Sequence, residues 1–243
     1  MTYCIGMNLA EGLVLASDSR TNAGVDHVRR AGKMRVLAEG GDRVVVTLSA
    51  GNLSLTQNAL NLIEHRERQE PERASLRSAQ SMFQVAQAIG DAMREIRARD
   101  EAYLRDGGID PSGSFIVGGQ IRGEAPRLFL VYSEGNFIES SVETPFFQTG
   151  ETKFGKPILD RVVNARTDLV TAAKCSLVSF DSTIRSNLSV GTPIDLLVYR
   201  RDSFQIGVQH RFEDTDPYLV AIRQSWNDSM RRAVAELPTP DWA

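Results

Sequence analysis

A threonine at the second position could carry the chemistry of hydrolysis on one residue. Removal of Met1 would leave Thr2 as the first residue of the chain. Its hydroxyl could attack a carbonyl carbon, and its own α-amine could accept the hydroxyl proton. That amine ordinarily titrates at about pH 7.7–8.0, close to where a base works well at neutral pH. We therefore expect Thr2 to be a nucleophile, the alternative being an ordinary chain start.

Charged residues stand at the ends of two predicted strands. Asp18, Ser19 and Arg20 close the second strand, and Lys33 begins the third. An antiparallel return of the chain would bring Lys33 near Asp18 and Thr2. Its ammonium would favour the neutral form of the terminal amine by like-charge repulsion and would stabilise negative charge on the threonine oxygen. The alternative is a solvated turn with an Asp–Arg pair.

Gly51 stands between a strand and a predicted helix. The run 44–46 is all valine, as expected of a strand buried on both faces. A glycine after such a strand lets a backbone N–H approach a ligand closely beside a helix N-terminus, which suits an oxyanion. The alternative is a plain turn in which Asn52 or Ser54 caps the helix.

Hydrophobic periodicity predicts the elements that position these residues. Apolar and β-branched runs predict strands at 2–9, 13–17, 34–38, 43–49, 114–120, 127–132, 137–140, 146–148, 193–199 and 204–210. Helical spacing predicts helices at 53–63, at 76–104 after Pro71, at 156–165, at 168–180, and in a tail that carries Tyr218, Ile222, Trp226 and Met230. Strand hairpins separated from helix pairs indicate an α+β fold, an αββα sandwich of two antiparallel sheets between helical layers.

Composition excludes several classes of partner. The chain has 243 residues, 42% hydrophobic and 24% charged, with a net charge of −3. A net negative charge does not indicate binding to nucleic acid or to an anionic membrane. No run of eighteen apolar residues, as a membrane-spanning helix would need, exists in the sequence. Cys4 and Cys175, with His27, His65 and His210, form no spaced metal cluster, so we expect no metal and no cofactor. Such sparse cysteine use indicates a reducing cytoplasm.

Taken together, these residues resemble a proteasome-type β subunit of the amino-terminal threonine hydrolase superfamily. The family pattern is a processed threonine, a strand, Asp-x-Arg-x-x-x-Gly, a lysine, and a strand that ends in Ala-Gly. The chain has these features in order at Thr2, Asp18, Arg20, Gly24, Lys33, Ala50 and Gly51, with an Asp-to-Lys interval one residue shorter than in proteasome β subunits and HslV. Residues 149–151 stand at the family's Ser-Gly, and 185–191 resemble its Arg-Asp-x-x-Ser-Gly loop.

Within that superfamily, the chain resembles the bacterial Anbu subgroup, the ancestral-β-subunit-like proteins. The resemblance lies in residues 17–24, 150–160 and 186–191. A carboxy-terminal extension beyond the length of HslV is also shared. This implies an Ntn-hydrolase domain over residues 2–212, followed by a helical extension of the same domain over 213–243.

The resemblance implies an endopeptidase that cleaves peptide or unfolded-protein substrates. Catalytic roles would fall on Thr2, Asp18, Lys33, Gly51, Thr149 and Ser189, with Asp18 orienting Lys33 and the Gly51 N–H stabilising the oxyanion. The side-chain pocket would involve Thr21, Asn22, Ala31, Ser49 and Leu53, which predicts a small-to-medium apolar preference. The enzyme would be cytoplasmic and would form a homo-oligomeric ring or helical arc. Whether an ATP-dependent unfoldase serves it stays open.

Two residues depart from the family pattern. Its supporting aspartate falls on Ser186, and Thr149 replaces its serine. Asp181 could replace the lost carboxylate, although we expect it in the preceding helix. Two other functions stay open, an amidase acting on small non-peptide amides and a catalytically silent assembly subunit.

Overall fold

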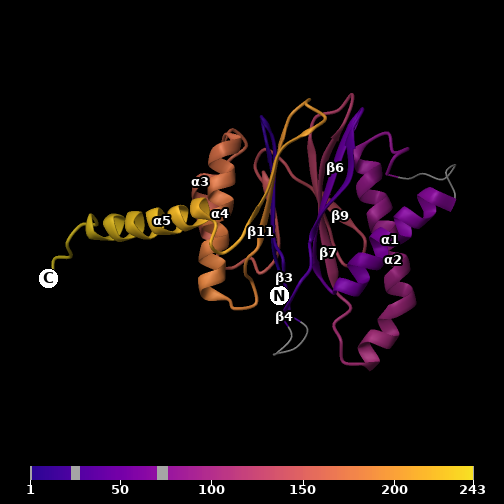
Figure 1. Ribbon diagram of the computed structural model, residues 1–243, viewed down its shortest axis with the longest axis horizontal. Coiled ribbons are helices and arrows are strands. Elements are labelled where there is room, and N and C mark those ends of the chain that lie inside the picture. The colour runs from indigo at the N-terminus through magenta and orange to yellow at the C-terminus, as the bar shows by residue number, and fades with distance from the viewer. Residues whose placement is uncertain (1, 23–27, 70–75, 243) are drawn as a thin grey trace.

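Two five-stranded antiparallel sheets lie face to face between helical layers (Figure 1). The computed structural model describes residues 2–22, 28–69 and 76–242. The first sheet has the order β10 (Phe146–Gly150), β1 (Tyr3–Leu9), β2 (Gly12–Asp18), β11 (Ile194–Arg200), β12 (Ile206–Phe212). The second has the order β5 (Met34–Gly40), β6 (Arg43–Gly51), β7 (Gly113–Ile121), β8 (Arg127–Val131), β9 (Phe137–Glu139). A small ribbon joins β3 (Arg20–Asn22) to β4 (Val28–Arg30).

Helices cover the outer face of each sheet. The helices α1 (Leu53–Gln69) and α2 (Met82–Asp106) lie against the second sheet, and α3 (Lys156–Val162) and α4 (Leu169–Ser186) lie against the first (Figure 1). The predicted α+β fold, an αββα sandwich, is therefore confirmed. None of the described helices is long and apolar enough to cross a membrane.

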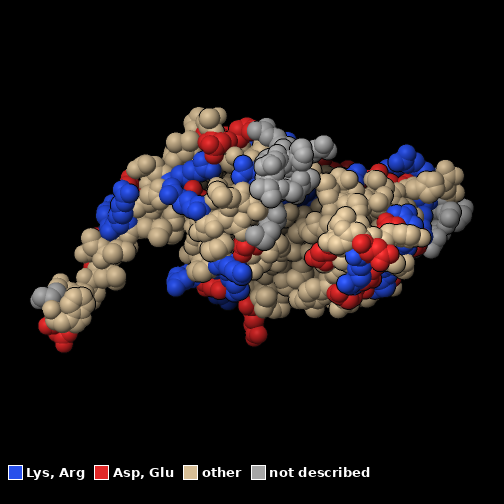
Figure 2. All heavy atoms as spheres, turned by 90° about the horizontal axis from the view of Figure 1, so that it is seen from below, with Lys and Arg blue, Asp and Glu red and all other residues tan. Residues whose placement is uncertain are grey.

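The last helix, α5 (Pro217–Ala235), extends away from the sandwich as an arm. Only Leu219 is fully buried on it, while Met230 and Val234 remain at least half exposed. Figure 2 shows the same arm from below, together with acidic and basic side chains interspersed over that face of the body. The tail is thus helical, as its spacing predicts, and all residues of α5 except Leu219 are partly or fully exposed.

Alternation along β1 decides which of its side chains reach the space between the sheets. Tyr3, Ile5 and Met7 pack with α3 and α4. Cys4 packs instead with residues of both sheets. Because successive side chains of a strand point to opposite faces, Thr2 shares the face of Cys4. The end of β1 therefore directs Thr2 to one end of the space between the sheets.

Several element boundaries differ from those that periodicity predicts, and two of the starts have a local explanation. The helix expected from Leu76 begins at Met82, because the Ser81 hydroxyl accepts a hydrogen bond from the Gln84 N–H and caps the helix there. The strand expected from Phe204 begins at Ile206. Phe204 has φ 51° and belongs to the turn instead. Pro71 lies outside the described residues.

Candidate active site

Thr2 lies at the amino-terminal end of β1, between β2 and β10. Tyr3 pairs with Gly150 of β10, and Cys4 pairs with Ser17 of β2. One step beyond, the Glu151 N–H donates to the Thr2 carbonyl oxygen at 2.7 Å. Thr2 is half-buried. Hydrogen bonding on both edges of β1 thus fixes the backbone at the first described residue.

A buried ion pair lies beside the start of β1. The distance from Lys33 Nζ to Asp18 Oδ1 is 2.6 Å, and the side chains are 4% and 0% exposed. The same carboxylate oxygen accepts the Tyr3 N–H at 3.0 Å, and Lys33 also donates to the Arg20 carbonyl oxygen at 2.6 Å. The fold therefore brings the lysine and the aspartate together next to Thr2.

The pKa of Asp18 reflects opposing influences. Burial raises the pKa above its ordinary value, while the Lys33 ammonium and the N–H groups of Tyr3 and Gly191 act to lower it. Burial also raises the pKa of the neighbouring Cys4 thiol, whose Sγ lies 3.6 Å from the Ser49 carbonyl oxygen. The Cys4 thiol is consequently uncharged at neutral pH and a poor nucleophile. Among the described residues, no group of His, Cys, Asp and Glu could hold a metal.

Gly51 ends β6 with a φ of 90°. A Cβ at this position would lie 2.5 Å from the Ser112 carbonyl oxygen, so only glycine fits. The next residue, Asn52, caps α1, since its Oδ1 accepts the Ser54 N–H at 3.0 Å. The turn is therefore capped by Asn52, and it requires glycine at position 51. Gly51 is exposed, and it lines a cavity of about 370 Å³ together with Thr149.

Thr149 bonds to a serine that sequence reasoning missed. Its Oγ1 lies 2.6 Å from Ser114 Oγ at the start of β7. Gly150 follows with φ 86°, and a Cβ there would lie 1.9 Å from the Thr2 carbonyl oxygen. Glycine at 150 therefore permits the close approach of β10 to the first residue of β1.

Ser189 lies in a loop that is tied to both sides of the site. The Ser189 N–H donates to Asn187 Oδ1 at 2.9 Å, and Asn187 Nδ2 donates to Glu151 Oε2 at 2.9 Å. From the other side, Arg20 Nη1 donates to the Leu188 carbonyl oxygen at 2.9 Å. The loop thus bridges the strand ends that carry Asp18 and Thr2.

Neither candidate position for the missing family carboxylate supplies one to this loop. Ser186, at the family position, is exposed as the last residue of α4. Asp181 lies within α4, as expected, and its carboxylate contacts Arg185 Nε at 3.1 Å and Arg223 Nε at 3.3 Å. Asp181 is therefore occupied by cations of α4 and α5, and it does not take the place of the family aspartate.

Two of the five predicted pocket residues line one cavity. Ser49 and Leu53 border a space of about 510 Å³, along with Gly32, Met34 and Arg35. Ala31 comes just before this lining and donates its N–H to the Ser19 carbonyl oxygen at 3.0 Å. Thr21 and Asn22 contribute backbone to β3, whereas Gly24 and the side chains of Thr21 and Asn22 lie outside the described part of the chain.

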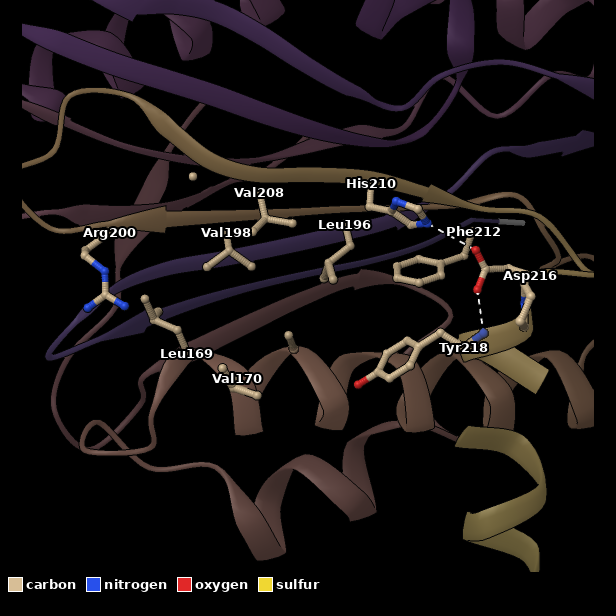
Figure 3. Close-up of a pocket in the computed structure, with 13 residues that line it drawn as sticks. Leu169, Val170, Leu196, Val198, Arg200, Val208, His210, Phe212, Asp216 and Tyr218 are labelled. Carbon is tan, nitrogen blue, oxygen red and sulfur yellow. Dashed lines mark hydrogen bonds and ion pairs between the residues drawn. The ribbon is translucent and has the colours of Figure 1, made fainter. Parts of the chain in front are cut away.

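A larger cavity, of about 700 Å³, lies on the outer face of the first sheet. Leu196, Val198 and Val208 point into it from β11 and β12, and α4 and Tyr218 close the opposite side (Figure 3). A contact of 3.1 Å between His210 Nε2 and Asp216 Oδ2 borders one end. Because the inner faces of the sheets point away from this cavity, it is separate from the site at Thr2.

Solved structures of other proteins are similar to this chain over nearly its whole length. An Anbu (Gly-1) mutant from Hyphomicrobium sp. strain MC1 is 46% identical, with a TM-score of 0.93 over 99% of this chain and 100% of that one. Anbu (ancestral β-subunit) from Yersinia bercovieri is 43% identical, with a TM-score of 0.92 over 99% and 100%. A helical assembly of the Anbu complex from Pseudomonas aeruginosa is 47% identical, with a TM-score of 0.92 over 98% of each chain.

Comparison with protein-family models and with curated proteins finds no match. The structural relatives are nevertheless far more than 30% identical over almost their full length. This chain therefore belongs to the Anbu (ancestral β-subunit) family of proteasome-like β subunits.

Proposed function

We propose that the chain is a threonine peptidase that uses Thr2 as its nucleophile once Met1 has been removed. The observation that carries the proposal is the buried Lys33–Asp18 pair, because Asp18 also holds the Tyr3 N–H at 3.0 Å. One carboxylate therefore orients the lysine and fixes the residue after Thr2. A buried lysine at the end of a strand is costly unless its charge is used or neutralised.

Acylation would begin when Thr2 Oγ1 attacks the carbonyl carbon of a substrate peptide bond. The α-amine of Thr2 takes the hydroxyl proton, directly or through a water molecule. Lys33 stabilises the negative charge that develops near the threonine oxygen, and the Gly51 N–H stabilises the oxyanion. The C–N bond then breaks, the α-ammonium returns the proton to the leaving amine, and an ester joins the acyl group to Thr2.

Hydrolysis of this ester would restore the enzyme. The same α-amine accepts a proton from water, the resulting hydroxide adds to the ester carbonyl, and the Thr2 oxygen leaves with the proton. Thr149 and Ser189 would supply hydroxyls around the amine. The 2.6 Å contact with Ser114 Oγ would hold the Thr149 hydroxyl in place.

The cavity beside Ser49 and Leu53 is the proposed binding site for the substrate side chain. Its lining includes Arg35 in addition to the apolar Met34 and Leu53. The guanidinium of Arg35 is paired with Glu64 at 2.8 Å, so it lines the cavity as a polar group whose charge is balanced. A medium-sized side chain with some polar character fits this lining better than the purely apolar one expected from sequence.

We also propose that the subunit assembles with copies of itself around a peptide or unfolded-protein substrate. The related protein from Pseudomonas aeruginosa is described as a helical assembly, and α5 exposes apolar residues far from its own body. Residues 2–212 would form the hydrolase domain, and 213–243 its extension. An amidase of small molecules would use the same site without needing such an assembly.

Peptide hydrolysis by paired variants tests this proposal. Thr2→Ala removes one hydroxyl at a half-buried site, so it should abolish cleavage of a peptide library while the far-ultraviolet circular dichroism stays unchanged. Thr2→Ser keeps the nucleophile and should retain part of the activity. Cleavage that survives in Thr2→Ala would contradict the mechanism. Cleavage of small amides alone would favour the amidase.

A further inference from the structure

Glu151 is a buried carboxylate in the site that the mechanism above does not use. Glu151 directly follows Gly150 and is only 7% exposed. Oε2 accepts a hydrogen bond from Asn187 Nδ2 at 2.9 Å, and Oε1 accepts the Lys153 N–H at 3.2 Å. No described lysine, arginine or histidine forms an ion pair with it. A buried carboxylate without a cation is destabilising, so a positive group is expected nearby.

Strand register places Glu151 opposite Thr2. Cys4 pairs with Thr149 and Tyr3 with Gly150, so the next pair joins Thr2 to Glu151. The 2.7 Å bond from the Glu151 N–H to the Thr2 carbonyl oxygen closes that pair. Glu151 lies one residue beyond the end of β10, and this bond holds its backbone against that of Thr2. The α-ammonium of a processed Thr2 would therefore form next to this residue.

We propose that Glu151 supplies the second carboxylate of the Thr2 site, in place of the aspartate expected at position 186, and faces the α-ammonium of Thr2. The same carboxylate holds Asn187, whose Oδ1 holds the Ser189 N–H at 2.9 Å. Glu151 is thus a positioning residue that links the terminal amine to the loop of Ser189. The inference rests on the proposed function because it requires Thr2 to be the first residue.

The charged groups near the start of β1 would set the pKa of the Thr2 amine. Lys33 disfavours the ammonium, Asp18 is hydrogen-bonded to Lys33, and Arg20 points to the Leu188 carbonyl oxygen. Glu151 is the carboxylate among these four groups that has no cation partner. It should favour the ammonium and raise the pKa of the amine, in opposition to Lys33.

Competitive labelling with acetic anhydride across pH 5–10 tests the inference. The full chain is released from an amino-terminal fusion so that it starts at Thr2, and the mass of its first peptide reports the acetylated fraction. Glu151→Gln keeps an acceptor for Asn187 but removes the charge. We expect the pKa of the Thr2 amine to fall by at least about half a unit in Glu151→Gln. The matched control Glu143→Gln, in an exposed loop, should leave it unchanged.

An amine that titrates alike in wild type, Glu151→Gln and Glu143→Gln would overturn the inference. Should Glu151→Gln fail to fold, Glu151→Asp keeps the charge but withdraws it by one methylene. A partial fall of the pKa in Glu151→Asp then supports the inference, and no change overturns it. This readout needs no hydrolysis, so an inactive wild type with the expected shift would contradict only the proposed peptidase.

Discussion

Lys33 and Asp18 form a 2.6 Å ion pair that is almost fully buried beside Thr2. The pair joins two strand ends that are fifteen residues apart in the chain. Such pairs contribute little net stability compared with apolar packing, but breaking one leaves an uncompensated charge. Its place at the first residue of β1 is therefore better explained by chemistry than by stability.

Lys33→Ala should lower the rate of peptide hydrolysis by at least about 10²-fold, because an electrostatic stabiliser is lost from a water-poor site. It should also lower the free energy of unfolding by roughly 3–5 kcal/mol, since Asp18 is left unpaired. Lys156→Ala is a matched control: its pair with Asp160 is about half exposed and should be worth at most about 1 kcal/mol. Urea unfolding and initial rates measure both effects. Equal rates in the two variants would remove Lys33 from the mechanism.

Gly150→Ala should displace Thr2. The new Cβ would lie 1.9 Å from the Thr2 carbonyl oxygen, at a φ of 86°. Gly40→Ala shares the backbone strain, with φ 95°, but has open space around the added methyl. The control should therefore lose only about 1–2 kcal/mol of unfolding free energy and keep its activity. Gly150→Ala should lose more stability and all hydrolysis, and equal behaviour of the two would contradict the close approach described for β10.

Filling the proposed pocket should change substrate preference and leave the nucleophile intact. Ser49→Phe places a ring in the cavity bordered by Leu53 and Arg35. We expect KM to rise for substrates with medium-sized side chains, with a smaller change for those cleaved after glycine or alanine. Asn61→Ala changes an exposed residue of the same lining and should have little effect. A preference that Ser49→Phe leaves unchanged would place the substrate side chain elsewhere.

Cys4 should resist alkylation in the native protein. Because burial raises the pKa of its thiol, less thiolate is present at pH 8 than for a free cysteine. Cys175 is also buried, and burial raises the pKa of its thiol too. Iodoacetamide at pH 8 should label both only in urea, as read by mass spectrometry. Native labelling of Cys4 that abolishes hydrolysis would instead point to a thiol nucleophile.

We expect α5 to contribute to assembly without being needed for folding of the sandwich. Removal of the whole extension over 213–243 would also break contacts with the body, because Leu219 is fully buried and Arg223 pairs with Asp181. A truncation of residues 226–243 keeps both contacts. It should leave a folded sandwich by circular dichroism and reduce the assembly size in light scattering, since exposed apolar residues such as Met230 are lost. An unchanged assembly would exclude this part of the tail from the interface.

Periodicity could predict the layers of this fold because each strand and helix buries one regular face. The boundaries at Met82 and Ile206 were missed for local reasons. Ser81 caps the helix, so the helix begins after it. The apolar Leu76 is buried in a turn before the helix. Phe204 adopts a positive φ that nothing in its side chain favours.

The site was partly predictable for a similar reason. An antiparallel return of the chain was expected to bring Asp18 and Lys33 together, and the β3–β4 ribbon makes this return between strands of different sheets. Glu151 and Asn187 are 36 residues apart, and Ser114 and Thr149 are 35 apart. These contacts depend on sheet stacking and loop placement, and a lone polar residue in a sequence looks like a solvated one. The family's Arg-Asp pattern directed attention to Ser186 instead.

Intact mass before and after treatment with a threonine-directed peptide epoxyketone tests the central claim most directly. We predict a starting mass that corresponds to a chain beginning at Thr2, and the addition of one inhibitor molecule that fragmentation places on Thr2. Thr2→Ala should gain no mass under the same conditions. A retained Met1 in active protein, or an adduct at another residue, would contradict the assignment of Thr2 as the nucleophile.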